Sequence, residues 1–313
     1  MVHFMARLVA RAVTTLVLVT AFIFFFYRLT PGHGSTVIPG FSDTPEQVAA
    51  LNAEPGILQY LRILRQWATG NFGYYPRFNE PIATVLAQAL PITVVLVAGA
   101  MLVSFVVAIP LGIIQGLNHG GVVDHALTGV EFLFFSAPLI LTAPLLANWF
   151  SFDVPLFPPQ APPGETFGAV LGHFNSMVLP IVTLALPLIG RLSRYVRSSV
   201  LDQVSLDYLV VARSKGCGPF RLVRKHLMRN AMIPILTFLG VSLPLLVSGG
   251  LVVEALFNLP GIGYLLWLAG NPKRVFFSFP LEIAILVVAS AALVLANLLV
   301  DVAMRIVDPR TRQ

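Results

Sequence analysis

The strongest concentration of charged side chains in this sequence is a run of Lys and Arg two-thirds of the way along the chain. Between Ala212 and Asn230, six of nineteen residues are Lys or Arg and none is acidic. The six are Arg213, Lys215, Arg221, Arg224, Lys225 and Arg229. Such side chains bind anionic partners, which are either the acidic surface of another protein or the headgroups of anionic lipids. The run therefore predicts a docking surface.

Side chains for catalysis, metal binding or nucleotide binding are not grouped in the sequence. The six His residues are scattered and form no HExxH pattern. The one cysteine, Cys217, excludes an internal disulfide and a metal cluster built on cysteines. No GxxxxGK[ST] motif is present, so the chain has no P-loop for ATP. We therefore predict no catalytic residues, no metal site and no cofactor of its own, and we expect that the protein is not an enzyme.

Two acidic residues are of interest because they fall near membrane depth in the spans predicted below. Glu131 lies at the start of the third span and Glu254 at the outer end of the fifth. Ionisable groups inside a membrane are costly and are functional candidates by default. The alternative is that each residue lies close enough to an interface to reach water, and for Glu254 we favour this alternative.

The elements that position these residues are predicted to be membrane helices. Only 11% of the residues are charged and 57% are hydrophobic, whereas about a quarter of an ordinary soluble domain is charged. A water-soluble surface cannot be built from this composition, and the short alternating segments of a membrane barrel are absent from the sequence. We therefore expect an all-α integral membrane protein.

Gaps between charged residues predict six membrane-spanning helices. We expect the first span to be retained, because no small-residue cleavage site follows it. The second is one long helix, because no turn signal interrupts the uncharged residues after Pro81 until Asn118. The six spans are expected over 12–27, 82–117 or 86–117, 132–152, 177–190, 230–253 and 283–300.

The distribution of Lys and Arg predicts how the chain is oriented. The segment 191–229 carries nine basic residues against two acidic ones, and both tails are basic. The loops 30–80 and 151–176 contain more acidic than basic residues. Because cytoplasmic loops collect Lys and Arg, both termini and the segment 191–229 are expected in the cytoplasm. Within the outer loop, Leu58, Leu61 and Leu64 are spaced for a short amphipathic helix resting on the outer surface.

The basic run is predicted to form two short helices broken by glycine. A first helix fits the apolar spacing over 206–213. Gly216 and Gly218 allow positive φ and Pro219 can begin a new helix, so the chain should break there. A second apolar stripe over 220–228 leads into the fifth span. Lipid binding would explain the positive charge but not the break, which favours docking to a protein.

With this spacing the run resembles the cytoplasmic EAA loop of ABC importer permeases, and most closely that of the dipeptide and oligopeptide (peptide/nickel) group. The matching residues are Asp207, Tyr208, Ala212, Arg213, Lys215, Gly216, His226, Arg229, Asn230, Ala231, Pro234 and Thr237. The likeness extends to "VEALFNLPGIGYLL" from Val253 and to "NLLVDVAMRIVDPRTR" from Asn297, and it covers most of the chain. It departs at Val210, which replaces the Glu of the general pattern, and at "PGHG" from Pro31.

The resemblance implies a type I ABC importer permease fold, with one transmembrane permease domain over 1–313, an extracytoplasmic loop over 30–80 and a coupling loop over 196–230. The implied partners are a second homologous permease subunit, two cytoplasmic ATPase subunits that bind ATP and Mg, an extracytoplasmic solute-binding protein and membrane lipids, with no nucleic acid. The implied location is a bacterial cytoplasmic (inner) membrane. The residues implied to couple to an ATPase are Asp207, Tyr208, Ala212, Arg213, Lys215 and Gly216.

The implied function is to form half of the pathway through which an ATP-driven importer moves dipeptides or oligopeptides. A nickel complex or another small peptide-like solute is an alternative cargo. A stand-alone ion-coupled transporter would require ionisable residues at mid-membrane, which the charge-free gaps disfavour. A structural lipid-binding membrane protein is a third possibility. The sequence does not identify the residues that contact substrate.

Overall fold

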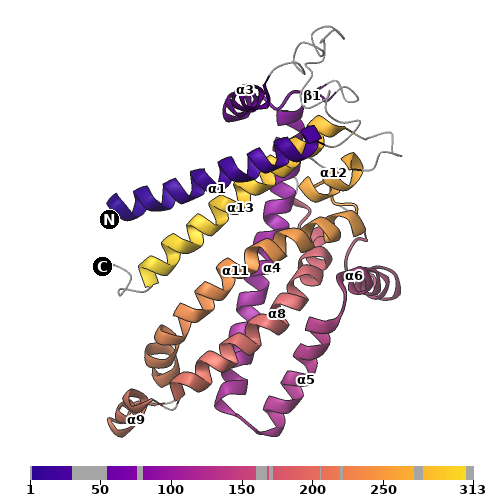
Figure 1. Ribbon diagram of the computed structural model, residues 1–313. Helices are drawn as coiled ribbons and strands as arrows, with labels where there is room; N and C mark the ends of the chain where they lie inside the picture. Colours follow the sequence, from indigo (N-terminus) through magenta and orange to yellow (C-terminus); the bar gives the residue numbers. More distant parts are fainter. Residues whose placement is uncertain are drawn as a thin grey trace. The chain divides into compact units, whose positions relative to one another are not determined.

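The computed structural model of the chain describes residues 2–29, 55–75, 80–159, 168, 172–204, 206–218, 221–270 and 278–307. Most of these residues are helical (Figure 1), and Tyr74–Tyr75 and Glu80–Pro81 form a two-residue antiparallel ladder. The elements are α1 (Val2–Leu29), α3 (Gly56–Ala68), β1 (Tyr74–Tyr75), β2 (Glu80–Pro81), α4 (Ile82–Leu117), α5 (Val122–Ser136), α6 (Leu139–Ala147), the π-helix η1 (Asn148–Asp153), α8 (Asn175–Val204), α9 (Asp207–Ser214), the π-helix η2 (Leu222–Leu227), α11 (Met228–Leu256), α12 (Ile262–Ala269) and α13 (Phe279–Val307).

Within the described residues, five helices are long and apolar enough to cross a membrane, namely α1, α4, α8, α11 and α13. The expectation of an all-α membrane protein is confirmed. The long second helix is confirmed as well, because α4 runs unbroken from Ile82 to Leu117. The fourth span begins at Asn175, close to the expected Met177.

The third span differs from its prediction. Its residues lie in α5, α6 and η1, which are long and apolar enough to cross a membrane only when taken together, with a bend of 101° between the two halves. A continuous span over 132–152 was therefore wrong, because α5 begins at Val122 and ends at Ser136. Ala137 is extended, with φ −72° and ψ 119°. The following Pro138 explains this, since proline disfavours a helical conformation in the residue before it.

The chain divides into two compact units. The first contains Met1–Val94, Ala161–Phe174 and Asn258–Leu295, and the second contains Val95–Gln160, Asn175–Phe257 and Ala296–Gln313. The division falls inside α4 and inside α13, so each of these helices contributes residues to both units.

The first unit packs its N-terminal helices through aromatic side chains. The short helix expected within the segment 30–80 is confirmed as α3, and its Leu58 and Leu61 are more than half exposed. The buried side chains are Tyr60, Ile63 and Trp67, which pack against α1. The Tyr60 hydroxyl donates to the carbonyl oxygen of Val17 at 2.9 Å.

The second unit is organised around α8, which packs against α5, α6 and α11 (Figure 1). Most of the apolar stretch of α8 is buried inside the molecule. In each of the other candidate spans, less than half of the corresponding stretch is buried. Glycines on α4 allow close approach to this helix. A Cβ added at Gly112 would lie 2.5 Å from the carbonyl oxygen of Ser193, and one at Gly116 would lie 2.7 Å from Cβ of Val200. The contact between α4 and α8 thus depends on missing side chains.

Gly112→Ala is therefore expected to destabilise the protein by about 1–3 kcal/mol, the usual cost of overpacking a core. Gly129→Ala on α5 is the matched control, because no atom lies within 4 Å of its added Cβ. That control should be neutral or stabilise the helix by up to about 1 kcal/mol. Thermal unfolding of the two purified variants in detergent measures the difference. Equal midpoints for both variants would contradict the close contact.

Candidate functional site

The first part of the site is a short helix that leaves the end of α8. Helix α9 (Asp207–Ser214) starts three residues after Val204, in agreement with the predicted helix over 206–213. The backbone N–H of Leu206 donates to the carbonyl oxygen of Gln203 at 3.1 Å. The hydroxyl of Tyr208 donates to Oε1 of Gln203 at 2.9 Å. These contacts tie the beginning of α9 to the last turn of α8.

Glycine ends α9 as the sequence predicted. Lys215 N–H donates to the carbonyl oxygen of Val211 at 3.2 Å, and Gly216 follows with φ 77°. Positive φ is the conformation that favours glycine at a helix C-terminus. A Cβ added at Gly216 would meet no atom within 4 Å, so only backbone strain opposes a side chain there. Gly218 was also expected to accept positive φ, but its φ lies outside that region.

Beyond the turn the chain enters α11 through a π-helix. The N–H of Leu222 donates to the carbonyl oxygen of Gly218 at 2.9 Å, and η2 (Leu222–Leu227) continues directly into α11. Single π turns inside helices are rare and frequently occur at functional sites. Leu209 of α9 is 1% exposed, as is Leu227 of η2, and α9, η2 and α8 are in contact. The short helix is thus anchored on its apolar face.

The residues that the family resemblance assigns to this loop lie on α9 and the turn after it. Asp207, Lys215 and Gly216 are exposed, and Tyr208 is half-buried. Ala212 and Arg213 belong to the backbone of α9, but their side chains lie outside the described residues, as do Pro219 and Phe220 entirely. Val211 is 52% exposed on the same helix. The loop therefore presents acidic, basic and apolar groups to its surroundings.

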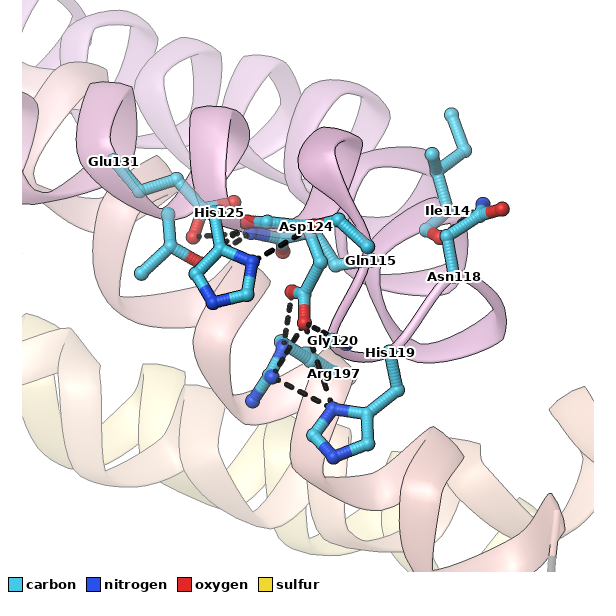
Figure 2. Close-up of polar contacts among 11 residues, drawn as sticks. Ile114, Gln115, Asn118, His119, Gly120, Asp124, His125, Glu131 and Arg197 are labelled. Carbon is cyan, nitrogen blue, oxygen red and sulfur yellow. Dashed lines mark hydrogen bonds and ion pairs between the residues drawn. The ribbon is translucent and has the colours of Figure 1, made fainter.

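The second part of the site is a buried ion pair between α5 and α8 (Figure 2). Nε and Nη2 of Arg197 donate to the two carboxylate oxygens of Asp124, at 2.7 and 2.8 Å. The backbone N–H of Gly120 donates to the same carboxylate at 2.9 Å. Nη2 of Arg197 also lies 3.0 Å from Nδ1 of His119. A bidentate arginine with a backbone donor is a strong and orientation-specific contact. It fixes the turn between α4 and α5 to α8.

Next to this pair, an amide and a second carboxylate join α4 to α5 (Figure 2). Nε2 of Gln115 donates to Oε2 of Glu131 at 3.0 Å and lies 3.3 Å from Oγ1 of Thr128. Gln115 is 0% exposed and Glu131 is 1% exposed. The alternative that Glu131 reaches water does not hold in this structure, nor does it hold for Glu254, which is also fully buried.

Sequence reasoning found Glu131 but missed its neighbours. Asp124 and Arg197 are separated by 73 residues, and nothing in local spacing pairs them. Two weak signals were present, namely an acid soon after the Gly120–Gly121 turn and the recurrence of arginine every third residue at 191, 194 and 197. Together the two parts of the site connect α9 to α8 and α8 to the α4–α5 turn, and they contain no catalytic arrangement within the described residues.

Comparisons with known proteins are consistent with a transport subunit. The model of the family described as "Binding-protein-dependent transport system inner membrane component" matches residues 108–313. A probable peptide ABC transporter permease protein of Sinorhizobium fredii is 34% identical, with 99% of each chain covered. The dipeptide transport system permease protein of Lactococcus lactis is 28% identical over the full length of both chains.

Among solved structures, a chain of the MetNI methionine ABC transporter in inward-facing conformations has a TM-score of 0.57. It is 18% identical, and the match covers 72% of this chain and 96% of that chain. At this identity the likeness concerns the fold alone. The expected fold of an ABC importer permease is confirmed.

Proposed function

This chain belongs to the family of binding-protein-dependent transport system inner membrane components, and we propose that it forms half of the membrane pathway of an ATP-driven peptide importer. The observation that supports a peptide as the cargo is the 34% identity, over nearly the whole chain, with a probable peptide permease. A permease makes and breaks no covalent bond. Its task is to alternate between two packings whose balance a partner shifts.

The partner that shifts this balance is a separate ATPase, and α9 is the part of this chain that enters a cleft on it. The coupling residues are Asp207, Tyr208, Ala212, Arg213, Lys215 and Gly216. Asp207 at the start of α9 and Lys215 just after its end are exposed and oppositely charged, which supports an oriented contact with a matched surface. The Tyr208–Gln203 hydrogen bond and the buried Leu209 support rigid transfer of force to α8 and, through η2, to α11.

The complete importer contains two such ATPase subunits, a second homologous permease and an extracytoplasmic solute-binding protein. ATP and Mg are bound by the ATPase subunits, and the chain itself holds no cofactor. The spans of this chain carry few polar side chains, so a second permease is required to complete a polar route for peptides.

Reconstitution tests this assembly. The chain in proteoliposomes by itself is expected to take up no dialanine, whereas the chain together with the second permease, both ATPases and the binding protein should take it up when ATP is present. Omission of ATP from the complete system is the control. Uptake of dialanine by this polypeptide without any partner would contradict the proposal and favour an ion-coupled transporter.

Orientation is tested by the single cysteine. Both termini and the loop 196–230 are proposed to lie in the cytoplasm, so Cys217 of intact cells should not react with a membrane-impermeant maleimide added outside. It should react after the cells are opened, because Cys217 is partly exposed. Labelling from outside in intact cells would reverse the orientation and remove α9 from contact with a cytoplasmic ATPase.

A further inference from the structure

Two arginines of α8 have no acidic partner within the described part of the chain. Nε of Arg194 donates to the carbonyl oxygen of Gly190 at 3.1 Å, and Nε of Arg191 lies 3.4 Å from that of Pro187. Both guanidinium groups lie over the ring of Phe135 on α5, with the carbon atoms 4.5 and 5.7 Å from its centroid. Cation–π contacts orient such groups but do not neutralise their charge.

The contrast with Arg197 on the same helix is informative. Arg197 is neutralised by Asp124, whereas Arg194 and Arg191 lie one and two turns further from the α4–α5 turn. They follow directly on the uncharged stretch 175–190 of a candidate membrane span. They therefore lie at the end of this span that the basic segment 191–229 is expected to place on the cytoplasmic side. Hydrogen bonds from Nε to backbone carbonyl oxygens leave the positive charge of each arginine available to an anion.

The space in front of Arg191 suits a small polar group. A cavity of about 30 Å³ lies between α6, α8 and α11, lined by Arg191 and Ser242, with leucines, a proline and a glycine on the remaining walls. This volume accommodates about one or two atoms the size of a water oxygen. Ser242 is 3% exposed, so the polar end of the cavity faces the interior of the second unit.

We propose that Arg191 and Arg194 form a binding site for the C-terminal carboxylate of the transported peptide. The inference rests on the proposed peptide importer. A guanidinium fork matches the two oxygens of a carboxylate better than an ammonium does, and Phe135 holds the two forks side by side. Because the site lies on the helix that continues toward α9, ATP-driven movement of α9 would also move the bound carboxylate.

The phosphate of a lipid headgroup offers the same charged oxygens to an arginine. Two observations favour the peptide. Arg191 lines a cavity between three helices, and Arg191 and Arg194 are both half-buried. A side chain that reaches for headgroups would instead extend along the outside of the protein.

The test compares uptake of dialanine with uptake of dialanine amide by the complete reconstituted importer. Each variant is assayed with saturating binding protein, so that the preference of the binding protein cancels in the ratio of variant to wild type. Arg191→Gln/Arg194→Gln should lower dialanine uptake about tenfold or more and change dialanine amide uptake less than about twofold. Arg191→Lys/Arg194→Lys keeps the charge and should lose less of the dialanine uptake. This variant is used for the test if the glutamine variant does not assemble. Arg11→Gln, exposed on α1, is the control and should change neither uptake.

The outcomes separate the possible anions. An equal loss for both peptides, or no loss for either, would overturn the carboxylate site while leaving peptide import intact. A loss that appears only when vesicles contain phosphatidylglycerol in addition to phosphatidylcholine would assign the arginines to lipid headgroups and overturn the inference. Uptake of neither peptide by the wild-type importer would refute the peptide cargo, and with it this site.

Discussion

Gly216→Val is expected to abolish transport while leaving the membrane helices folded. Gly216 has φ 77°, and a β-branched residue in that region costs on the order of 1–3 kcal/mol. The added side chain would meet no neighbour within 4 Å, so the chain can relieve the strain only by changing the turn. A changed turn redirects α9 relative to η2. We expect dialanine uptake and substrate-stimulated ATP hydrolysis of the reconstituted importer to fall to background.

Gly218→Val is the matched control two residues away. Its added Cβ also meets no atom within 4 Å, but its φ lies outside the positive region, so the variant should retain most of its transport. Neutralising Arg221 together with Arg224 should likewise reduce transport less than Gly216→Val does, if the shape of the turn matters more than the total charge of the basic run. Normal transport by Gly216→Val, with the Arg221/Arg224 variant inactive, would mean that attraction to lipids explains the basic run.

The second large effect is expected from Asp124→Ala. Asp124 is 2% exposed and accepts two hydrogen bonds from Arg197, so its removal leaves an uncompensated cation. Breaking a buried pair costs about 3–5 kcal/mol. The side chain of Arg197 is 27% exposed, which places the expected loss at the lower end of that range. Thermal unfolding of the purified chain measures it.

A double variant distinguishes the ion pair from a general effect of mutation. Asp124→Ala/Arg197→Met removes both charges and should be more stable than Asp124→Ala, because no buried charge remains unpaired. If the two substitutions are additive, the carboxylate and the guanidinium do not interact. The single variant is also expected to reduce coupling between ATP hydrolysis and uptake, since the α4–α5 turn would no longer be fixed to α8.

Local signals were sufficient to predict some of these elements. The long α4 follows from an uninterrupted apolar run, and α9 with its end at Gly216 follows from helical spacing and a glycine turn. The prediction of the third span failed because it was based on gaps between charged residues alone. It ignored Pro138, which breaks the helix inside an apolar segment. The contact between α3 and α1 through Tyr60 was not predicted, because it joins residues 43 apart in the sequence.

The site was predictable only where it is continuous in sequence. The basic run is one segment, and its residue spacing was enough to predict the short helix α9 and the glycine turn after it. The ion pair joins residues 73 apart, and Gln115 meets Glu131 across two helices. Such pairs depend on how α4, α5 and α8 pack, which is decided by glycines and side-chain volumes that a single sequence does not relate to one another.

The central claim is that α9 is the surface on which a separate ATPase acts. Photochemical cross-linking tests it most directly, with benzoylphenylalanine in place of Val211, which is 52% exposed on α9. The same group in place of Leu58, 58% exposed on α3, is the control. Irradiation of the assembled importer should join position 211, but not position 58, to an ATPase subunit. An adduct from position 211 only to lipid or to the binding protein, with none to an ATPase subunit, would contradict the account.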